Sequence, residues 1–235
     1  MTSSAFTDHL QQKLDGFLKQ VLESPLWASV ADPKADPLYV RTVIKYVLLE
    51  IFSYGPHVTE ATFTAIGRFP KDRPDLMKPM ILHDISEVNH CEIALRDFVR
   101  LGGDESWARS RRITPASFAM AATVRMLAQS ESPFAYLGYM YPFESLTPVL
   151  TAHIQPILAR QAFPAESQRF IDFHATEDIA HAKALRAFVE RVVAEYPSAK
   201  DAIEYAFACF SVVYPIPIWT AAEAHARLEL EGRPI

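Results

Sequence analysis

The sequence predicts an all-α protein, a single-domain helical bundle of about seven helices. Apolar residues recur every three to four positions over long stretches, which is the period of a helix with one buried face. The chain has only 7 glycines against 17 prolines, and its few Asn-Gly or Asp-Gly pairs give little sign of β-hairpins. Half of its 235 residues (50%) are hydrophobic, which is enough to build a sizeable core.

The prolines lie mostly between apolar blocks, where they end helices. The two proline-rich segments Asp32–Pro37 and Pro70–Pro79 are short enough to be interhelical connections, so we expect residues 1–235 to form one domain. The expected helices are Ala5–Leu22, Leu38–Ile66 with a break near Gly55-Pro56, Pro74–Leu101 ending before Gly102-Gly103, Pro115–Gln129, Phe134–Arg160, Ala165–Glu195 and Ser198–Leu230.

Charge and composition exclude several classes of protein. The net charge is −5 and the short basic run Arg109–Arg112 is too small for a nucleic-acid-binding face. The two cysteines, Cys91 and Cys209, lack metal-site spacing and indicate a reducing compartment without a disulfide framework. The N-terminus has no apolar signal-peptide core, and no uncharged apolar stretch of membrane-spanning length occurs. We therefore expect a soluble cytoplasmic protein with neither nucleic acid nor a membrane as partner.

Two segments, His83–His90 and His174–His181, share the pattern His-x3-acid-x2-His. At about 100° per residue, these offsets place all three side chains within about 60° on one helix face. Two imidazoles and a carboxylate aimed at one point suit iron, manganese or zinc. The six residues are His83, Glu87, His90, His174, Asp178 and His181.

A non-metal interpretation of these residues has to be weighed. A single histidine on an apolar helix face is more often a hydrogen-bonded core residue than a ligand. The repeated pattern outweighs that interpretation, because buried acids between apolar neighbours need cations or other partners. Glu50, in the apolar segment KYVLLEIF, is either a further ligand or an acid paired with Lys45, Arg41 or His57.

Beyond this pattern, residues 39–193 resemble the heme-oxygenase-like diiron oxidases. The resemblance rests on the pattern His174-x3-Asp178-x2-His181, on His90 followed twelve residues later by Gly102, and on Glu144 in LGYMYPFESLTP. It implies a heme-oxygenase-like bundle that holds two iron ions, with manganese as an alternative in one site, and takes dioxygen as co-substrate.

The resemblance also implies a set of metal ligands. Many members carry a glutamate where His83 stands, so Glu87 is the first choice of acid and Asp84 the next. His83 is then an extra ligand or a hydrogen-bonding neighbour, and Glu50 occupies the place of an occasional seventh ligand. Glu87, Glu144 and Asp178 are the expected catalytic acids. The full expected metal set is Glu87, His90, Glu144, His174, Asp178, His181, His83 and Glu50.

An aromatic cluster precedes Glu144. Most such clusters are core, but ligand pockets favour aromatic walls, so Tyr139, Tyr141 and Phe143 are expected to line a substrate pocket. The resemblance implies hydroxylation, desaturation or carbon–carbon or carbon–nitrogen cleavage of a small, amino-acid-derived substrate by a homodimer, with an external electron donor where needed. The alternatives are a fatty-acid-processing or self-sacrificing oxidase with the same site, a metal-free TenA- or PqqC-like enzyme, or a non-catalytic regulator.

Overall fold

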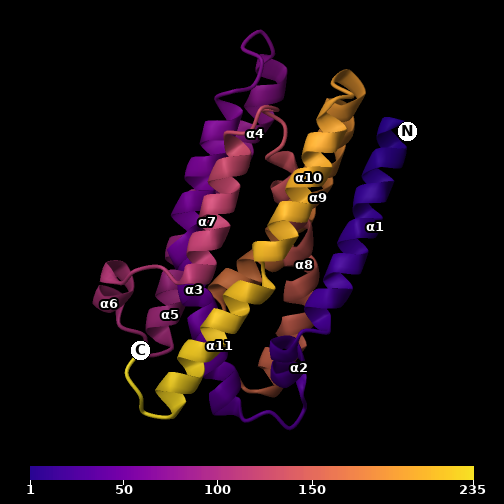
Figure 1. Ribbon diagram of the computed structural model, residues 1–235. Helices are drawn as coiled ribbons and strands as arrows, with labels where there is room; N and C mark the ends of the chain where they lie inside the picture. The colour runs from indigo at the N-terminus through magenta and orange to yellow at the C-terminus, as the bar shows by residue number, and fades with distance from the viewer.

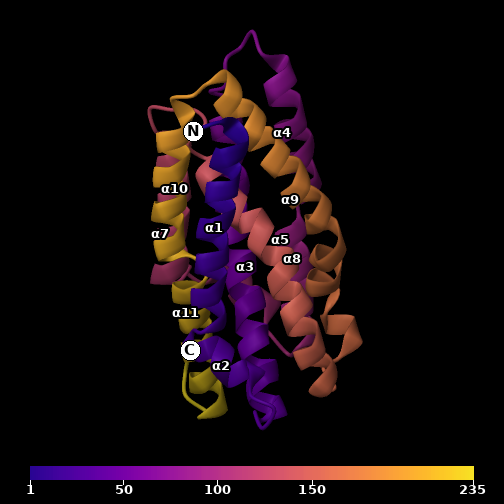
Figure 2. The ribbon, with the colours of Figure 1, turned by 90° about the vertical axis from the view of Figure 1, so that its right-hand side faces the viewer.

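The protein is a bundle of helices without any strand. The computed structural model describes residues 1–235 and contains eleven α-helices and one short 3-10 helix. Figures 1 and 2 show an elongated bundle in which the long helices run along its length and α2 lies at the lower end. The helices are α1 Ser3–Leu22, α2 Pro25–Ala31, α3 Pro37–Ile66, α4 Pro74–Glu87, α5 His90–Arg100, α6 Glu105–Ser110, α7 Pro115–Ala128, α8 Leu137–Arg160, α9 Arg169–Glu195, α10 Ala199–Val213 and α11 Ile216–Leu230.

The expected all-α bundle is confirmed, but the expected number of helices is wrong. Nine helices have eleven residues or more, instead of about seven. Two further helices, α2 and α6, are short and were not expected. The differences arise because two expected long helices are each divided in the structure, as described below.

Helix α3 is the central helix of the bundle. Asp36 caps its first turn, with its Oδ1 accepting a hydrogen bond from the Leu38 backbone N at 2.9 Å. The expected break near Gly55-Pro56 is wrong, since the helix continues through Pro56. Packing of α3 against α5, α7 and α11 outweighs the local cost of the proline. Gly55 is needed there, because a Cβ at this position would lie 2.7 Å from Cys91 Cβ on α5.

The expected helix Pro74–Leu101 is divided at Val88-Asn89. Helix α4 ends at Glu87, and Asn89 has a left-handed backbone with φ of 75° before α5 begins at His90. Asparagine tolerates this conformation better than most residues. The helical-face geometry deduced for His90 is therefore wrong, because His90 lies on a different helix from Glu87.

The expected helix Ser198–Leu230 is divided at Tyr214-Pro215 into α10 and α11. The segment Ala199–Leu230 is the one stretch long and apolar enough to cross a membrane by length and composition. In the structure α10 packs on α8 and α11 packs on α3. Contacts inside the bundle account for much of this apolar character.

The buried apolar residues form two clusters that share α3. Residues of α3 up to Leu49 belong to the smaller cluster with parts of α2, α5 and α11, and residues from Tyr54 onward belong to the larger cluster with α1, α7 and α10. Helices α8 and α9 contribute to both clusters. The buried acids Glu144 and Asp178 of these two helices belong to neither apolar cluster.

Candidate metal centre

Four helices bring the expected ligands together. The C-terminal turns of α4 carry His83 and Glu87, and the first residue of α5 is His90. Helices α8 and α9, which pack closely along their length, carry the remaining ligands. These are Glu144 on α8 and His174, Asp178 and His181 on α9.

One group of ligand atoms comes from His83, Glu87, Glu144 and His181, and all of them lie within 4.8 Å of one another. His181 Nδ1 is 3.1 Å from Glu87 Oε1 and 3.7 Å from Glu144 Oε2. His83 Nε2 is 3.6 Å from the same oxygen of Glu144. Asp178 lies beside this group, with its Oδ1 3.7 Å from His181 Nδ1.

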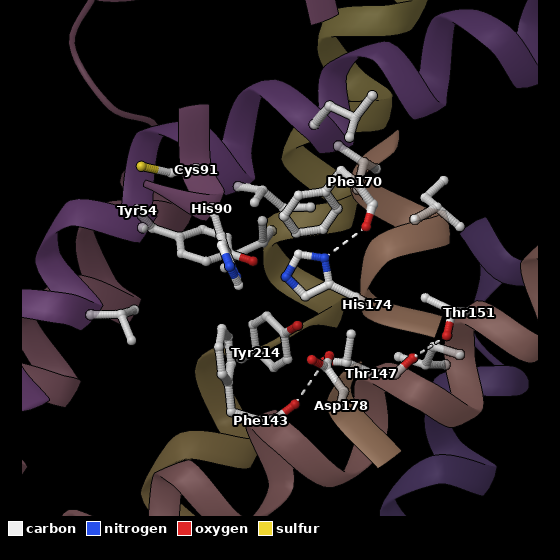
Figure 3. A pocket seen from close by; sticks show the side chains of 18 of the residues that line it. Tyr54, His90, Cys91, Phe143, Thr147, Thr151, Phe170, His174, Asp178 and Tyr214 are labelled. Atoms are coloured by element: carbon white, nitrogen blue, oxygen red, sulfur yellow. Dashed lines mark hydrogen bonds between the residues drawn. The ribbon is translucent and has the colours of Figure 1, made fainter. Parts of the chain in front are cut away.

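A second group consists of Glu87, His90 and His174, again with ligand atoms within 4.8 Å. His90 Nδ1 lies 2.6 Å from Glu87 Oε2. The ring centroids of His90 and His174 are 5.0 Å apart, and Figure 3 shows these two rings beside each other at the cavity wall. Glu87 belongs to both groups, with one carboxylate oxygen near His181 and the other near His90.

The donor atoms of the cluster fit a metal. Both ring nitrogens of His83 are buried without a hydrogen bond, and Nδ1 of His90 and Nδ1 of His181 face carboxylate oxygens without the geometry of a hydrogen bond. Buried polar atoms are almost always partnered, so a gathering of such nitrogens beside carboxylates calls for a cation. Imidazole and carboxylate donors without cysteine suit iron.

His174 shows how the surrounding helix orients a ligand. Its Nδ1 donates a hydrogen bond to the Phe170 backbone oxygen at 2.7 Å, as the dashed line in Figure 3 shows. That bond fixes the ring and leaves Nε2 available to a metal, an arrangement typical of histidine ligands.

The cluster retains protons that a cation would displace. Burial, with the charges of Glu144 and Glu87, raises the pKa of Asp178 to about 8. Contacts with Glu144 and Glu87 raise the pKa of His181 to about 10 despite burial. The pKa of Glu87 is lowered, because its contacts with His181 and His90 outweigh the effect of burial. A cation stabilises the deprotonated forms of these side chains in place of the protons.

The structure places Glu50 outside both groups. Its carboxylate is fully buried and accepts hydrogen bonds from Thr114 Oγ1 and Ser117 Oγ, both at 2.6 Å, and from Arg111 Nη1 at 3.3 Å. Of the alternative partners, Lys45 pairs with Glu229 and His57 contacts Arg125. Glu50 is thus a satisfied structural carboxylate between α3 and α7.

Asp84 also belongs to neither group of ligands. Its side chain is buried and lines the cavity, and its Oδ2 has no hydrogen-bond partner. Burial raises the pKa of Asp84 to about 7. Of the two residues His83 and Asp84, only His83 lies next to the other expected ligands.

The cluster opens on a cavity of about 200 Å³. Of the three expected pocket residues only Phe143 lines it. Tyr139 shares a hydrogen bond with Thr62 in the core, and Tyr141 donates to Gln11 of α1. Two tyrosines line the cavity beside the expected ligands (Figure 3). They are Tyr54 of α3 and Tyr214 of the α10–α11 connection, and their ring centroids are 6.2 Å apart.

Sequence reasoning missed Tyr54 and Tyr214 because they are far from the metal pattern along the chain. His90 and His174 line the cavity but no lysine or arginine does, and 20 of its 31 lining residues are hydrophobic. The apolar lining from α2, α3, α8 and α9 includes Leu26, Trp27, Val30, Val43, Ile44, Val47, Leu48, Ile51, Leu150, Ile154, Phe170 and Ile171.

A bundle with two histidine–carboxylate groups around one shared glutamate defines a candidate metalloenzyme, and comparison with known proteins gives its family. Residues 63–213 match the model of a family described as iron-containing redox enzymes. The matched region is most of the chain, so the protein belongs to this family. No curated protein matches the chain in sequence.

Solved structures show the fold. A domain of unknown function with a heme oxygenase-like fold from Shewanella denitrificans aligns with a TM-score of 0.76 at 20% identity, covering 96% of this chain and 95% of that one. A TenA homolog from Pseudomonas syringae pv. tomato gives 0.75 at 15% identity, covering 96% of both chains. A TenA homologue from P. horikoshii gives 0.75 at 15% identity, covering 93% of this chain and 98% of that one. The chain therefore has the heme-oxygenase-like fold.

Proposed function

We propose that this iron-containing redox enzyme is a non-heme dinuclear iron oxidase or oxygenase that uses dioxygen to hydroxylate, desaturate or cleave a small substrate. The observation that carries the proposal is Glu87, whose two carboxylate oxygens face separate groups of ligands. The first ion would be held by His83, Glu144 and His181 with Asp178 beside them, and the second by His90 and His174. Bound iron would supply the redox chemistry that activates dioxygen, with manganese as an alternative in one of the two sites.

Buried aromatic residues line the cavity beside the cluster and reduce the room for water there. Tyr54 and Tyr214 are buried, and Phe143 packs edge-to-face on Tyr54 with ring centroids 6.4 Å apart. Exclusion of water strengthens electrostatic interactions within a site and protects reactive species from side reactions.

The cavity lining favours an apolar substrate over an amino-acid-derived one. A fatty acid places one charged group at the metal cluster and buries the rest of its length against a lining in which 20 of 31 residues are hydrophobic, whereas a free amino acid has a second charge and little apolar surface to bury. A buried charge without a partner is costly. The lining therefore supports the fatty-acid-processing alternative, in which an alkyl chain lies in the apolar part and its carboxylate meets the metal ions.

A direct test uses protein loaded anaerobically with ferrous iron and a straight-chain fatty acid such as laurate. After exposure to oxygen we expect oxygen uptake that depends on the acid, and a desaturated, hydroxylated or shortened product in the mass spectrum. The zinc-loaded protein is the control and should be inactive, because zinc has no redox chemistry. Equal oxygen uptake with zinc-loaded or metal-free protein would overturn the proposal, because the oxidation would then not depend on iron.

Two expectations about partners remain predictions. Reduction of dioxygen to water takes more electrons than one desaturation supplies, so we expect an external electron donor to stimulate turnover. We also expect a homodimer, which sedimentation of the purified protein would detect.

A further inference from the structure

The cavity has a defined direction. Its lining residues on α8 run from Glu144 through Thr147 and Leu150 to Ile154. At a rise of about 1.5 Å per residue, Glu144 and Ile154 are separated by about 15 Å along the helix. Beyond the cluster, the α8 lining consists of Thr147 and Thr151, whose hydroxyls donate to carbonyls of their own helix, together with Leu150 and Ile154, so the part that leads toward Ile154 is mainly apolar.

Two half-buried tryptophans line the cavity near Ile154. Trp27 of α2 stacks on Trp219 of α11 with ring centroids 5.8 Å apart and planes inclined by 27°. His153 of α8 meets the Trp27 ring edge-on at 6.3 Å. Leu26 and Val30, on either side of Trp27 in α2, complete the wall.

We propose that the Trp27–Trp219 pair is an end stop that sets the length of the apolar chain this enzyme accepts. The inference rests on the proposed function, in which the substrate's polar head lies at the metal cluster and its chain runs toward α2. Stacked indoles are large and rigid, and each ring packs against the other. Unlike a flexible side chain, they do not move aside to make room for a longer chain.

The end stop has a measurable signature. Each methylene that moves from water into an apolar cavity strengthens binding by about fourfold. Affinity for a series of straight-chain acids should therefore rise with length until the chain end reaches the indoles, and then level off or fall. Removing one indole extends the cavity, so the turning point should move to longer acids. A purely structural role for the tryptophans would weaken binding of all acids alike.

The first experiment measures binding without turnover. Calorimetry on zinc-loaded protein would compare octanoate, decanoate, laurate, myristate and palmitate in the native chain, in Trp27→Ala and in Trp219→Leu. Trp107→Leu is the matched control, because Trp107 of α6 packs against Arg111 and does not line the cavity. We expect a longer preferred acid in the first two variants and no change in the control. If Trp27→Ala fails to fold, Trp27→Leu replaces it.

The second experiment locates the chain end. Trp107→Phe leaves Trp27 and Trp219 as the only tryptophans, since the chain has 3. Laurate carrying bromine on its terminal carbon should quench their fluorescence strongly, whereas laurate brominated beside the carboxylate should quench it weakly.

The outcomes separate the two proposals. Acids that bind and drive oxygen uptake, but show an unchanged length preference in Trp27→Ala and Trp219→Leu, would overturn the end stop alone. Stronger quenching by bromine beside the carboxylate would overturn it too. Failure of every acid to bind the zinc-loaded native protein would overturn both the end stop and the apolar substrate on which it rests.

Discussion

Glu87 is the residue on which the dinuclear site depends. Its oxygens lie 2.6 Å from His90 Nδ1 and 3.1 Å from His181 Nδ1, on opposite sides of the carboxylate. Sequence reasoning selected this acid over Asp84, and the structure brings Glu87 to the ligands while Asp84 belongs to neither group. The geometric argument for this acid failed for His90, because the turn at Asn89, rather than one helix face, brings Glu87 and His90 together.

Removal of the Glu87 carboxylate should weaken both metal sites. We expect Glu87→Ala, assayed for iron after anaerobic loading, to retain less than half of the native iron, because both groups of ligands lose a shared donor. The matched control is Glu177→Ala, since Glu177 is an exposed acid next to Asp178 on the same helix. Full iron content in Glu87→Ala would show that it is not the shared ligand.

His83 should hold one metal rather than merely support a neighbour. Both of its ring nitrogens are buried and unpartnered, and it belongs to the group with Glu144 and His181. We expect His83→Ala to lose one iron and keep the other, while Asp84→Asn keeps both. A supporting residue would cost only about 10–100-fold in affinity, so two tightly bound irons in His83→Ala would contradict this assignment.

Metal binding should release protons. The pKa of Asp178 is raised to about 8 and that of His181 to about 10, so both side chains carry protons at neutral pH without metal. The metal needs both in their deprotonated forms. Protons therefore compete with the metal, and zinc affinity should rise as the pH increases toward 8. Calorimetry in buffers of different ionisation enthalpy would measure the released protons, and an affinity independent of pH would contradict this electrostatic account.

At the scale of helices, Asn89 shapes the site through its backbone. Its left-handed conformation, with φ of 75°, ends α4 and lets α5 begin at His90. Periodicity predicted one continuous helix here because the apolar pattern continues across the turn. A single asparagine is too weak a signal to locate a break.

Substitutions at Asn89 should therefore depend on backbone preference. Asn89→Val should lower the free energy of unfolding by about 1–2 kcal/mol, because side chains other than asparagine, aspartate or glycine are strained in the left-handed region. Asn89→Gly is the control and should be nearly neutral in thermal unfolding, because glycine adopts this conformation freely. Equal losses in both variants would indicate that the asparagine side chain, rather than its backbone, matters.

Glu50 joins α3 to the start of α7 and should affect stability without affecting metal. Its hydrogen bonds come from Thr114 and Ser117, and Arg111 lies 3.3 Å from it. Glu50→Ala leaves the largely buried Arg111 without its counter-charge, a change that typically costs about 3–5 kcal/mol. Denaturant unfolding should show this loss while iron content in the folded fraction stays native. If Glu50→Ala instead lost one iron and kept its stability, Glu50 would be a metal ligand.

At the scale of the whole molecule, the sequence predicted the all-α fold class, which followed from periodicity. Of the expected ligands, six came from two local patterns and Glu144 from the family resemblance, and the structure brings these seven residues together. The cavity could not be predicted in the same way, because Tyr54, Tyr214 and the tryptophans Trp27 and Trp219 come from separate parts of the chain. Only the packing of the helices brings these residues together, and no local sequence pattern predicts that they are close.

The central claim is that one chain holds two metal ions joined through Glu87. The most direct measurement is anaerobic titration of the metal-free protein with ferrous iron, followed by Mössbauer spectroscopy of the loaded protein before and after oxygen. The account predicts saturation at two irons per chain and, after oxygen, a magnetically coupled diferric spectrum that is absent in Glu87→Ala. Saturation at a single iron, or two irons without coupling in the native protein, would contradict it.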